Sequence, residues 1–136
     1  MTISEVVTYS VGEAAAAVGL TTYTLRWYEQ EGLVEPVDRD SAGRRRYTEG
    51  DLGFLALLTK LRRTGMSVAD MRKFAELIRE GSHTVPARLE LLERHRDGVL
   101  ERIDALRQDL EAVNYKIDIY RAEARSATNG PLQDPV

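Results

Sequence analysis

An apolar heptad repeat in the C-terminal half of the chain most constrains how it can fold. From residue 85 the apolar spacing alternates between three and four, as in the seam of a coiled coil. Such a helix of about 37 residues is roughly 55 Å long, and the rest of the chain is too small to cover it. Another chain must therefore cover the seam. Nine of its ten positions are apolar, and we predict that they form a dimer interface: Leu89, Leu92, Val99, Ile103, Leu106, Leu110, Val113, Ile117 and Tyr120.

The tenth seam position is Arg96. Two interpretations remain open for it. Its aliphatic stem could lie along the seam while the guanidinium reaches water. Alternatively, it is a polar position that sets the register of the two helices.

Before residue 81 the sequence predicts short helices with well-marked ends. A hydroxyl residue stands three positions before a carboxylate at Ser10/Glu13, Thr48/Asp51 and Ser67/Asp70. The first pair is a full capping box, and the aspartates are shorter variants that still favour a helix start. We expect helices over residues 11–18, 22–31, 49–63, 68–80 and 85–125. The first two, joined by a tight turn at Gly19, have the outline of a helix-turn-helix.

The segment after this helix pair is expected to form a small hairpin. Pro36 blocks a helix there, and Val34, Val37 and Tyr47 flank a polar turn at residues 40–43. The returning strand carries three consecutive arginines, Arg44, Arg45 and Arg46. A basic hairpin beside a helix-turn-helix is typical of a wing that reaches for DNA phosphate.

The formal net charge of −3 conceals an uneven distribution. Residues 39–73 hold nine basic and four acidic side chains, whereas residues 80–136 hold eight basic and eleven acidic ones. This asymmetry favours a basic binding surface joined to a solvated acidic segment. The alternative is that exposed arginines merely keep the domain soluble.

Several classes of function are excluded by composition. The chain has no cysteine, which rules out disulfides, thiolate metal sites and thiol nucleophiles. Two histidines, His83 and His95, are too few for an all-histidine zinc site. We find no nucleophile–base arrangement and no phosphate loop, so we expect neither an enzyme nor a cofactor. There is no apolar run of membrane-spanning length and no signal peptide, so we expect a cytoplasmic protein that does not engage membranes.

Residues 9 to about 78 resemble the DNA-binding domain of MerR-family transcriptional regulators. The resemblance rests on TLRWYE followed by GL, on the pattern of Gly43, Arg45 and Tyr47, and on LRRTGMSVADMR at a later helix junction. The following coiled-coil helix is similar to the dimerisation helix of the family. The resemblance implies a mainly α protein in which a winged helix-turn-helix precedes a long coiled-coil helix.

The resemblance also implies a function. Such a protein would be a homodimer, joined by an antiparallel coiled coil, that binds a pseudo-palindromic promoter site. Many members distort the spacer between two promoter elements so that RNA polymerase can use both, and several also repress. Bending and untwisting DNA costs several kcal/mol, which phosphate contacts must offset.

Carried onto this chain, the resemblance places Thr22, Tyr23 and Arg26 on the recognition helix. Arg26 could read a guanine edge or hold a phosphate; the alternative is an ion pair with Glu29 on the same helix face. Tyr23 stands where relatives often have a basic residue, so base recognition cannot be copied from them. Trp27 matches an aromatic position near the DNA backbone and could equally be a core residue.

The remaining predicted DNA contacts come from several elements. Tyr28 could donate its hydroxyl to phosphate, and Tyr47 is as readily a packing residue. For Arg62 and Arg63, near the later helix junction, contact with phosphate and simple exposure to solvent remain equal alternatives. These further predicted DNA-binding residues are Tyr28, Arg44, Arg45, Arg46, Tyr47, Arg62 and Arg63.

We predict three segments: a DNA-binding domain at residues 1–81, a dimerisation helix at 82–125 and a disordered tail at 126–136. Only about fifteen residues follow the coiled coil, so we expect no large drug-binding domain in this chain. An organic ligand could bind between the helices of the dimer near Tyr115 and Tyr120, although packing in the seam and on its flank is the preferred explanation of these tyrosines. The effector, and the choice between activation and repression, stay open.

A second hypothesis comes from a different class of protein. The coiled coil could recruit another protein while the basic wing binds DNA without sequence preference, as in a structural adaptor. A footprint over one promoter site would favour the regulator, and equal affinity for unrelated duplexes would favour the adaptor.

Overall fold

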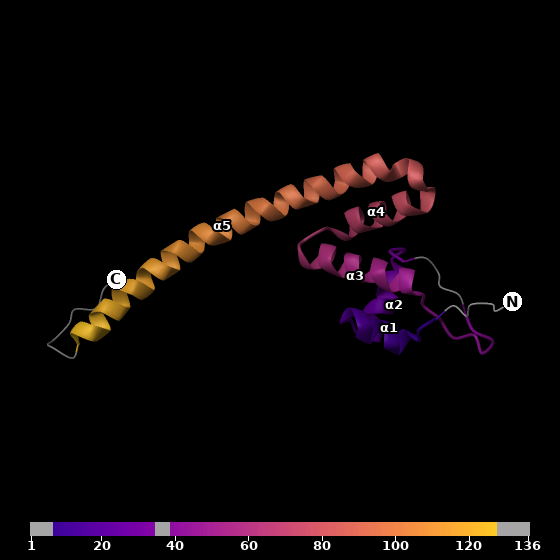
Figure 1. The fold of residues 1–136 in the computed structure, drawn as a ribbon, viewed down its shortest axis with the longest axis horizontal. Helices are drawn as coiled ribbons and strands as arrows, with labels where there is room; N and C mark the ends of the chain where they lie inside the picture. Colours follow the sequence, from indigo (N-terminus) through magenta and orange to yellow (C-terminus); the bar gives the residue numbers. More distant parts are fainter. Residues whose placement is uncertain (1–6, 35–38, 128–136) are drawn as a thin grey trace. The chain divides into compact units, whose positions relative to one another are not determined.

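The computed structural model describes residues 7–34 and 39–127, and this part of the chain is built from helices. In chain order they are α1 (Val11–Val18), α2 (Thr22–Gln30), α3 (Glu49–Arg63), α4 (Val68–Glu80), the short 3-10 helix η1 (Ser82–Thr84) and α5 (Val85–Ser126) (Figure 1). The predicted mainly α fold class is confirmed, and the predicted helix ends agree to within one residue. Val37, Pro36 and most of the predicted tail lie outside the described residues.

The helix starts form where the hydroxyl–carboxylate pairs predict them. At α1 the Glu13 amide donates to Ser10 Oγ at 3.2 Å, and the Ser10 amide donates to Glu13 Oε1 at 2.9 Å. At α3 the expected shorter variant is in fact a complete capping box, because Asp51 Oδ2 accepts from the Thr48 amide at 2.8 Å. Both helices therefore begin at a position fixed by local side-chain chemistry.

A tight turn joins α1 to α2. Gly19 ends α1 with φ +72°, a left-handed conformation that costs a glycine little. The Leu20 amide then donates to Ala15 O at 2.9 Å, which satisfies a carbonyl at the end of α1. The next residue, Thr21, caps α2 by accepting from the Thr24 amide at 3.1 Å. This is the turn of a helix-turn-helix.

The core of the DNA-binding part gathers side chains from α1 to α4. Helix α1 contacts α2 and α3, and α3 contacts α4 (Figure 1). Helix α1 contributes Ala14 and Ala15 to this core. The largest fully buried side chains come from α2, α3, α4 and the loop between α2 and α3: Leu25, Tyr28, Leu33, Tyr47, Leu55, Leu58 and Met71. This shared core packs the helix-turn-helix against α3 and α4.

The expected hairpin is present as a minimal structure. Within the described residues its two strands meet at one isolated antiparallel bridge, Arg39 with Arg45, and a second bridge joins Tyr47 to Tyr9, which precedes α1. The turn between Arg39 and Arg45 closes through the Gly43 amide, which donates to Asp40 O at 2.9 Å, and the Asp40 amide donates to Arg44 O at 2.8 Å. We call residues 39–47 the wing.

The chain divides into two compact units between His95 and Arg96. The first turns of α5 belong to the first unit, because Leu91 is buried in its core and Leu92 packs against that core. Leu92, predicted as a dimer residue, therefore has packing partners within its own chain. The predicted domain boundary between residues 81 and 82 lies at the end of a helix and not at this division, and it stays a prediction.

In the second unit α5 leaves its apolar side chains in solvent. The exposed large side chains there are Leu100, Ile103, Leu106, Leu110, Val113, Tyr115, Ile117 and Tyr120. Leu106 is 67% exposed, which is far from what a leucine adopts in a finished core. Among the described residues, no helix combines the length and apolarity that crossing a membrane needs.

Candidate nucleic-acid interface

Helix α2 separates its side chains into a buried and an exposed face. Leu25 and Tyr28 point into the core, with 0% and 1% of their surfaces exposed. On the other face Thr22, Tyr23 and Arg26 are exposed, and Tyr23 is 79% exposed. The face that does not pack is thus the face predicted to meet the DNA groove.

Arg26 has no ion-pair partner among the described residues. The alternative that paired it with Glu29 is not realised, since Glu29 is taken by two residues of the wing. An unpaired guanidinium keeps all its N–H donors for a base edge or a phosphate. The structure therefore leaves Arg26 available for the predicted contact.

Glu29 connects the recognition helix to the wing. Arg45 Nε lies 2.6 Å from Glu29 Oε2, and the Tyr47 hydroxyl donates to Glu29 Oε1. The Glu29 side chain is only 9% exposed. Burial, followed by the hydrogen bond to Glu29, raises the pKa of the Tyr47 hydroxyl, which stays protonated as a donor. The wing is consequently fastened to α2 by a charged pair and a charge-assisted hydrogen bond.

Asp40 organises the turn of the wing. Its Oδ1 accepts from the amides of Ala42 and Arg44, each at 2.9 Å, and its Oδ2 pairs with Arg44 Nε at 3.1 Å. The backbone hydrogen bond from Arg44 is the largest cause that holds the pKa of Asp40 below its ordinary value. Arg46 is held separately, by donating to Thr8 Oγ1 at 3.0 Å and to Thr8 O at 3.1 Å.

A basic hollow forms where the wing meets α1 and α2. Ser10 and Val11 contribute the start of α1, and five arginines line the remainder: Arg26, Arg39, Arg44, Arg45 and Arg46. Among the residues that the structure describes, Asp40 and Glu29 are the carboxylates paired with these arginines, and they balance two of the five charges. The excess positive charge beside the recognition helix suits a polyanion.

The structure corrects two predicted contacts. Tyr28 and Tyr47 are 1% and 0% exposed, so neither ring forms part of the surface that DNA could touch. Tyr47 serves instead as a core residue whose hydroxyl fixes Glu29. These two aromatic residues thus belong to the sequence motifs because they pack in the core and not because they touch DNA. For Tyr47 this is the packing alternative that the sequence leaves open.

Arg62 and Arg63 are exposed at the end of α3. The Arg62 guanidinium lies over the ring of Trp27, 4.6 Å from its centroid. Arg62 and Trp27 line a second hollow with Tyr23 and Thr24 of α2, and Arg63 is not part of it. Arg62 therefore adjoins the recognition helix, on a surface that is distinct from the wing.

Sequence reasoning missed two arginines of α4 that hold the end of α2. Arg72 donates from Nε to Glu31 O at 2.9 Å and from Nη2 to Glu31 Oε2 at 2.5 Å. Arg79 donates to Gly32 O. The C-terminal end of a helix carries unpaired carbonyls and partial negative charge, which guanidinium groups complement. Their spacing of seven residues places both on one face of α4, a signal that the sequence did contain.

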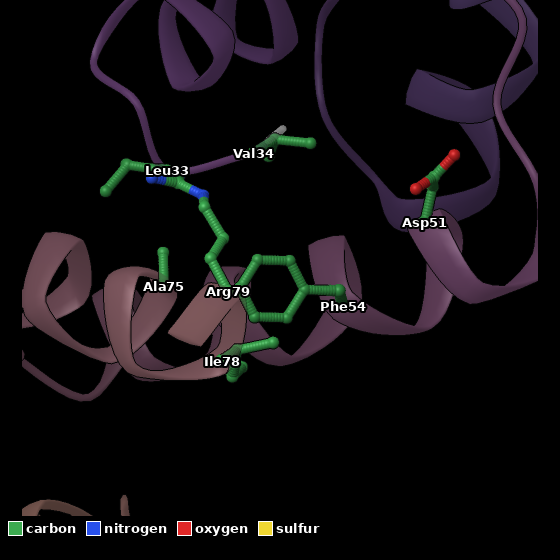
Figure 2. A pocket seen from close by; sticks show the side chains of 7 residues that line it. All are labelled: Leu33, Val34, Asp51, Phe54, Ala75, Ile78 and Arg79. Atoms are coloured by element: carbon green, nitrogen blue, oxygen red, sulfur yellow. The ribbon is translucent and has the colours of Figure 1, made fainter. Parts of the chain in front are cut away.

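An apolar hollow lies beside the same end of α2. Figure 2 shows Leu33 and Val34 facing Ala75, Ile78 and Arg79 of α4, with Phe54 of α3 between them; Asp51 completes the lining. The Arg79 side chain extends toward Leu33 in this view.

Within residues 7–34 and 39–127 no group of three or more histidines, cysteines or carboxylates could hold a metal ion.

A helix-turn-helix with an exposed recognition face, a wing fastened beside it and a surplus of arginine define a winged helix-turn-helix DNA-binding protein. Residues 9–77 match the family model described as MerR HTH family regulatory protein. Residues 54–113 match a second model, described as MerR, DNA binding. The chain therefore belongs to the MerR family, and it is a sequence-specific DNA-binding transcriptional regulator.

Similar proteins agree with this assignment along most of the chain. An uncharacterized HTH-type transcriptional regulator from Haemophilus influenzae is 41% identical over 114 residues, or 84% of each chain. The structure of HiNmlR, a MerR family regulator lacking the sensor domain, bound to promoter DNA, is 39% identical. It has a TM-score of 0.79 and covers 88% of this chain and 94% of its own. The structure of a MerR-family transcriptional regulator from Bacillus thuringiensis is 29% identical and has a TM-score of 0.76. The match covers 84% of this chain and 100% of the other.

Proposed function

We propose that the protein binds a pseudo-palindromic promoter site as a homodimer, with α2 of each copy in a major groove and each wing along the backbone. One observation carries this proposal: Arg26 of the recognition helix and the arginines of the wing line a single hollow. A duplex that places its groove on α2 would bring a phosphate strand to that hollow. Phosphate contacts fix the position, and base contacts select the sequence.

The exposed seam of α5 supports the homodimer. From Ile103 to Tyr120 its apolar side chains keep the three–four spacing, and those from Leu106 to Val113 are more than half exposed. A second copy of the same helix provides a matching apolar face. Two copies also present two recognition helices, which a pseudo-palindromic site requires.

Regulation is the less defined part of the proposal. HiNmlR is described as lacking the sensor domain and as bound to promoter DNA. We propose a similar organisation here, in which the dimer distorts the promoter spacer and so affects its use by RNA polymerase. We assign it no catalytic activity and no cofactor, place it in the cytoplasm with its DNA, and name no effector.

Selection of bound duplexes from a random library, followed by footprinting, tests the proposal. The full chain should enrich an inverted repeat and protect one continuous site. Its affinity for that site should exceed the affinity for random duplex by about 10³-fold or more. Equal affinity for unrelated duplexes would instead support the adaptor hypothesis, which the family assignment does not favour.

Promoter distortion needs its own measurement. Transcription with purified RNA polymerase should depend on the protein when the spacer has its natural length. Removing base pairs from the spacer should abolish this dependence, because polymerase then reaches both elements without help. Dependence that is unchanged by spacer length would contradict the distortion model.

A further inference from the structure

We infer that Trp27 is a positioning residue for DNA binding: its indole ring holds the Arg62 guanidinium at the edge of the recognition helix, ready to grip a phosphate. The inference rests on the proposed placement of DNA on the exposed face of α2. It assigns a function to the one aromatic residue of the TLRWYE segment whose role the sequence leaves open.

The geometry that carries the inference is a cation–π stack between two helices. The central carbon of the Arg62 guanidinium lies 4.6 Å from the centroid of the Trp27 ring, well within the range of such contacts. Trp27 belongs to α2 and Arg62 to the last turn of α3. The stack therefore brings an arginine of α3 onto the surface of the recognition helix.

Stacking leaves the donors of Arg62 free. The ring occupies one side of the guanidinium, so the N–H groups that point away from the ring stay available. Arg62 forms no ion pair among the described residues, in contrast to Arg44, Arg45 and Arg72, which face carboxylates. Its charge and its donors are both available to an anion.

The platform itself is fixed by the core. Trp27 is half-buried and packs against the buried cluster. Its ring lies 5.6 Å from that of Tyr28, which is 1% exposed, with 51° between the planes. A ring anchored in this way restricts the long Arg62 side chain before DNA arrives, and preorganisation lowers the entropy lost on binding.

The position of the stack points to the phosphate backbone as its ligand. Trp27 and Arg62 line one hollow with Tyr23 and Thr24 from the start of α2. The wing arginines line a different hollow, with Arg26. A duplex whose groove receives Tyr23 and Arg26 would then be held from both sides, by the wing and by Arg62.

A double-mutant cycle tests the inference, with affinity for the selected operator as the readout. Arg62→Ala should weaken binding about three- to tenfold and reduce the slope of log affinity against log salt by about one. Trp27→Leu should weaken binding by a smaller factor. The double variant should bind no worse than Arg62→Ala alone, because the platform matters only through the arginine.

The chain contains a single tryptophan, so its fluorescence reports on the stack directly. Arg62→Ala should change the emission of Trp27 in the free protein, and operator should perturb it less in that variant than in the original chain. Arg107→Ala, which removes one exposed positive charge from the coiled-coil segment, is the matched control and should change neither emission nor the coupling.

Three results would overturn the inference. The first is independent, additive losses from Trp27→Leu and Arg62→Ala. The second is a Trp27→Leu variant whose affinity for the operator is unchanged while Arg62→Ala weakens operator binding. The third is an Arg62→Ala variant that binds like the original chain while Arg26→Ala is weakened. If Arg26→Ala also binds normally, the proposed placement of DNA has failed instead. Should Trp27→Leu not fold, Trp27→Phe takes its place in the cycle, with Arg62→Ala unchanged.

Discussion

Arg45 of the wing and Glu29 of the recognition helix form an ion pair, with Nε and Oε2 only 2.6 Å apart. The pair is shared with Tyr47, whose hydroxyl donates to the same carboxylate. An arginine expected simply to hold phosphate thus also sets the position of the wing. Two residues of the motif formed by Gly43, Arg45 and Tyr47 therefore hold the wing against α2, in addition to any contact that the motif makes with DNA.

Arg45→Ala should lower the free energy of unfolding by about 1 kcal/mol, because Glu29 would lose its cation in a mostly buried setting. It should also weaken operator and random duplexes alike and lower the salt slope by about one. Thermal unfolding and a salt series on both duplexes measure the two effects. Arg44→Ala, whose side chain is 79% exposed, is the comparison and should change the stability by less than about 0.5 kcal/mol.

Arg26→Ala should distinguish base reading from simple charge. Because Arg26 is exposed and unpaired among the described residues, its loss should weaken operator binding by about 1–3 kcal/mol if it makes a bidentate base contact. Random duplex should lose less. Equal losses on both duplexes would mean that Arg26 grips only phosphate.

Replacing both Leu106 and Leu110 by glutamate should separate the two copies or unfold the protein. Both side chains are more than half exposed in the single chain, and charges in a packed seam would be buried without partners. Light scattering should give the monomer mass, and operator binding should be lost. A dimer mass that stays the same would place the dimer contact elsewhere.

The turn of the wing should depend on the charge of Asp40. Hydrogen bonds from the Arg44 and Ala42 amides and the charge of Arg44 lower its pKa in the folded protein. A lowered folded pKa means that the stabilisation is complete above the unfolded value, and is lost as pH falls through the folded value. The carboxyl chemical shift of Asp40 should therefore titrate below 3.8, its ordinary value. Asp40→Asn should remove this titration, and a midpoint at or above 3.8 would contradict the geometry.

Arg72→Ala should loosen the end of the recognition helix. Arg72 satisfies both the carbonyl and the carboxylate of Glu31. The side chains of Arg72 and Glu31 are each more than a third exposed, so we expect a modest loss of about 1–2 kcal/mol in the free energy of unfolding. Hydrogen exchange should increase at the last turn of α2. Unchanged exchange there would show that the core alone fixes that helix end.

The sequence by itself determined the elements, because their causes are local. Ser10, Thr48 and Ser67 accept hydrogen bonds from amides three residues on, and these contacts fix the starts of α1, α3 and α4. Gly19 ends α1 for a reason confined to its own backbone. The seam from Ile103 to Tyr120 follows from periodicity along one helix, so it could be found without knowing the fold.

Only the tertiary structure decided which motif residues reach the surface. Trp27 and Tyr28 are neighbours of one chemical class, yet one carries Arg62 on its ring and the other is buried. Arg26 and Arg45 are equally basic, yet only Arg45 meets Glu29. These outcomes depend on contacts between residues far apart in sequence, across α2, α3, α4 and the wing. No periodicity or cap encodes such contacts, because they exist only once the helices have packed.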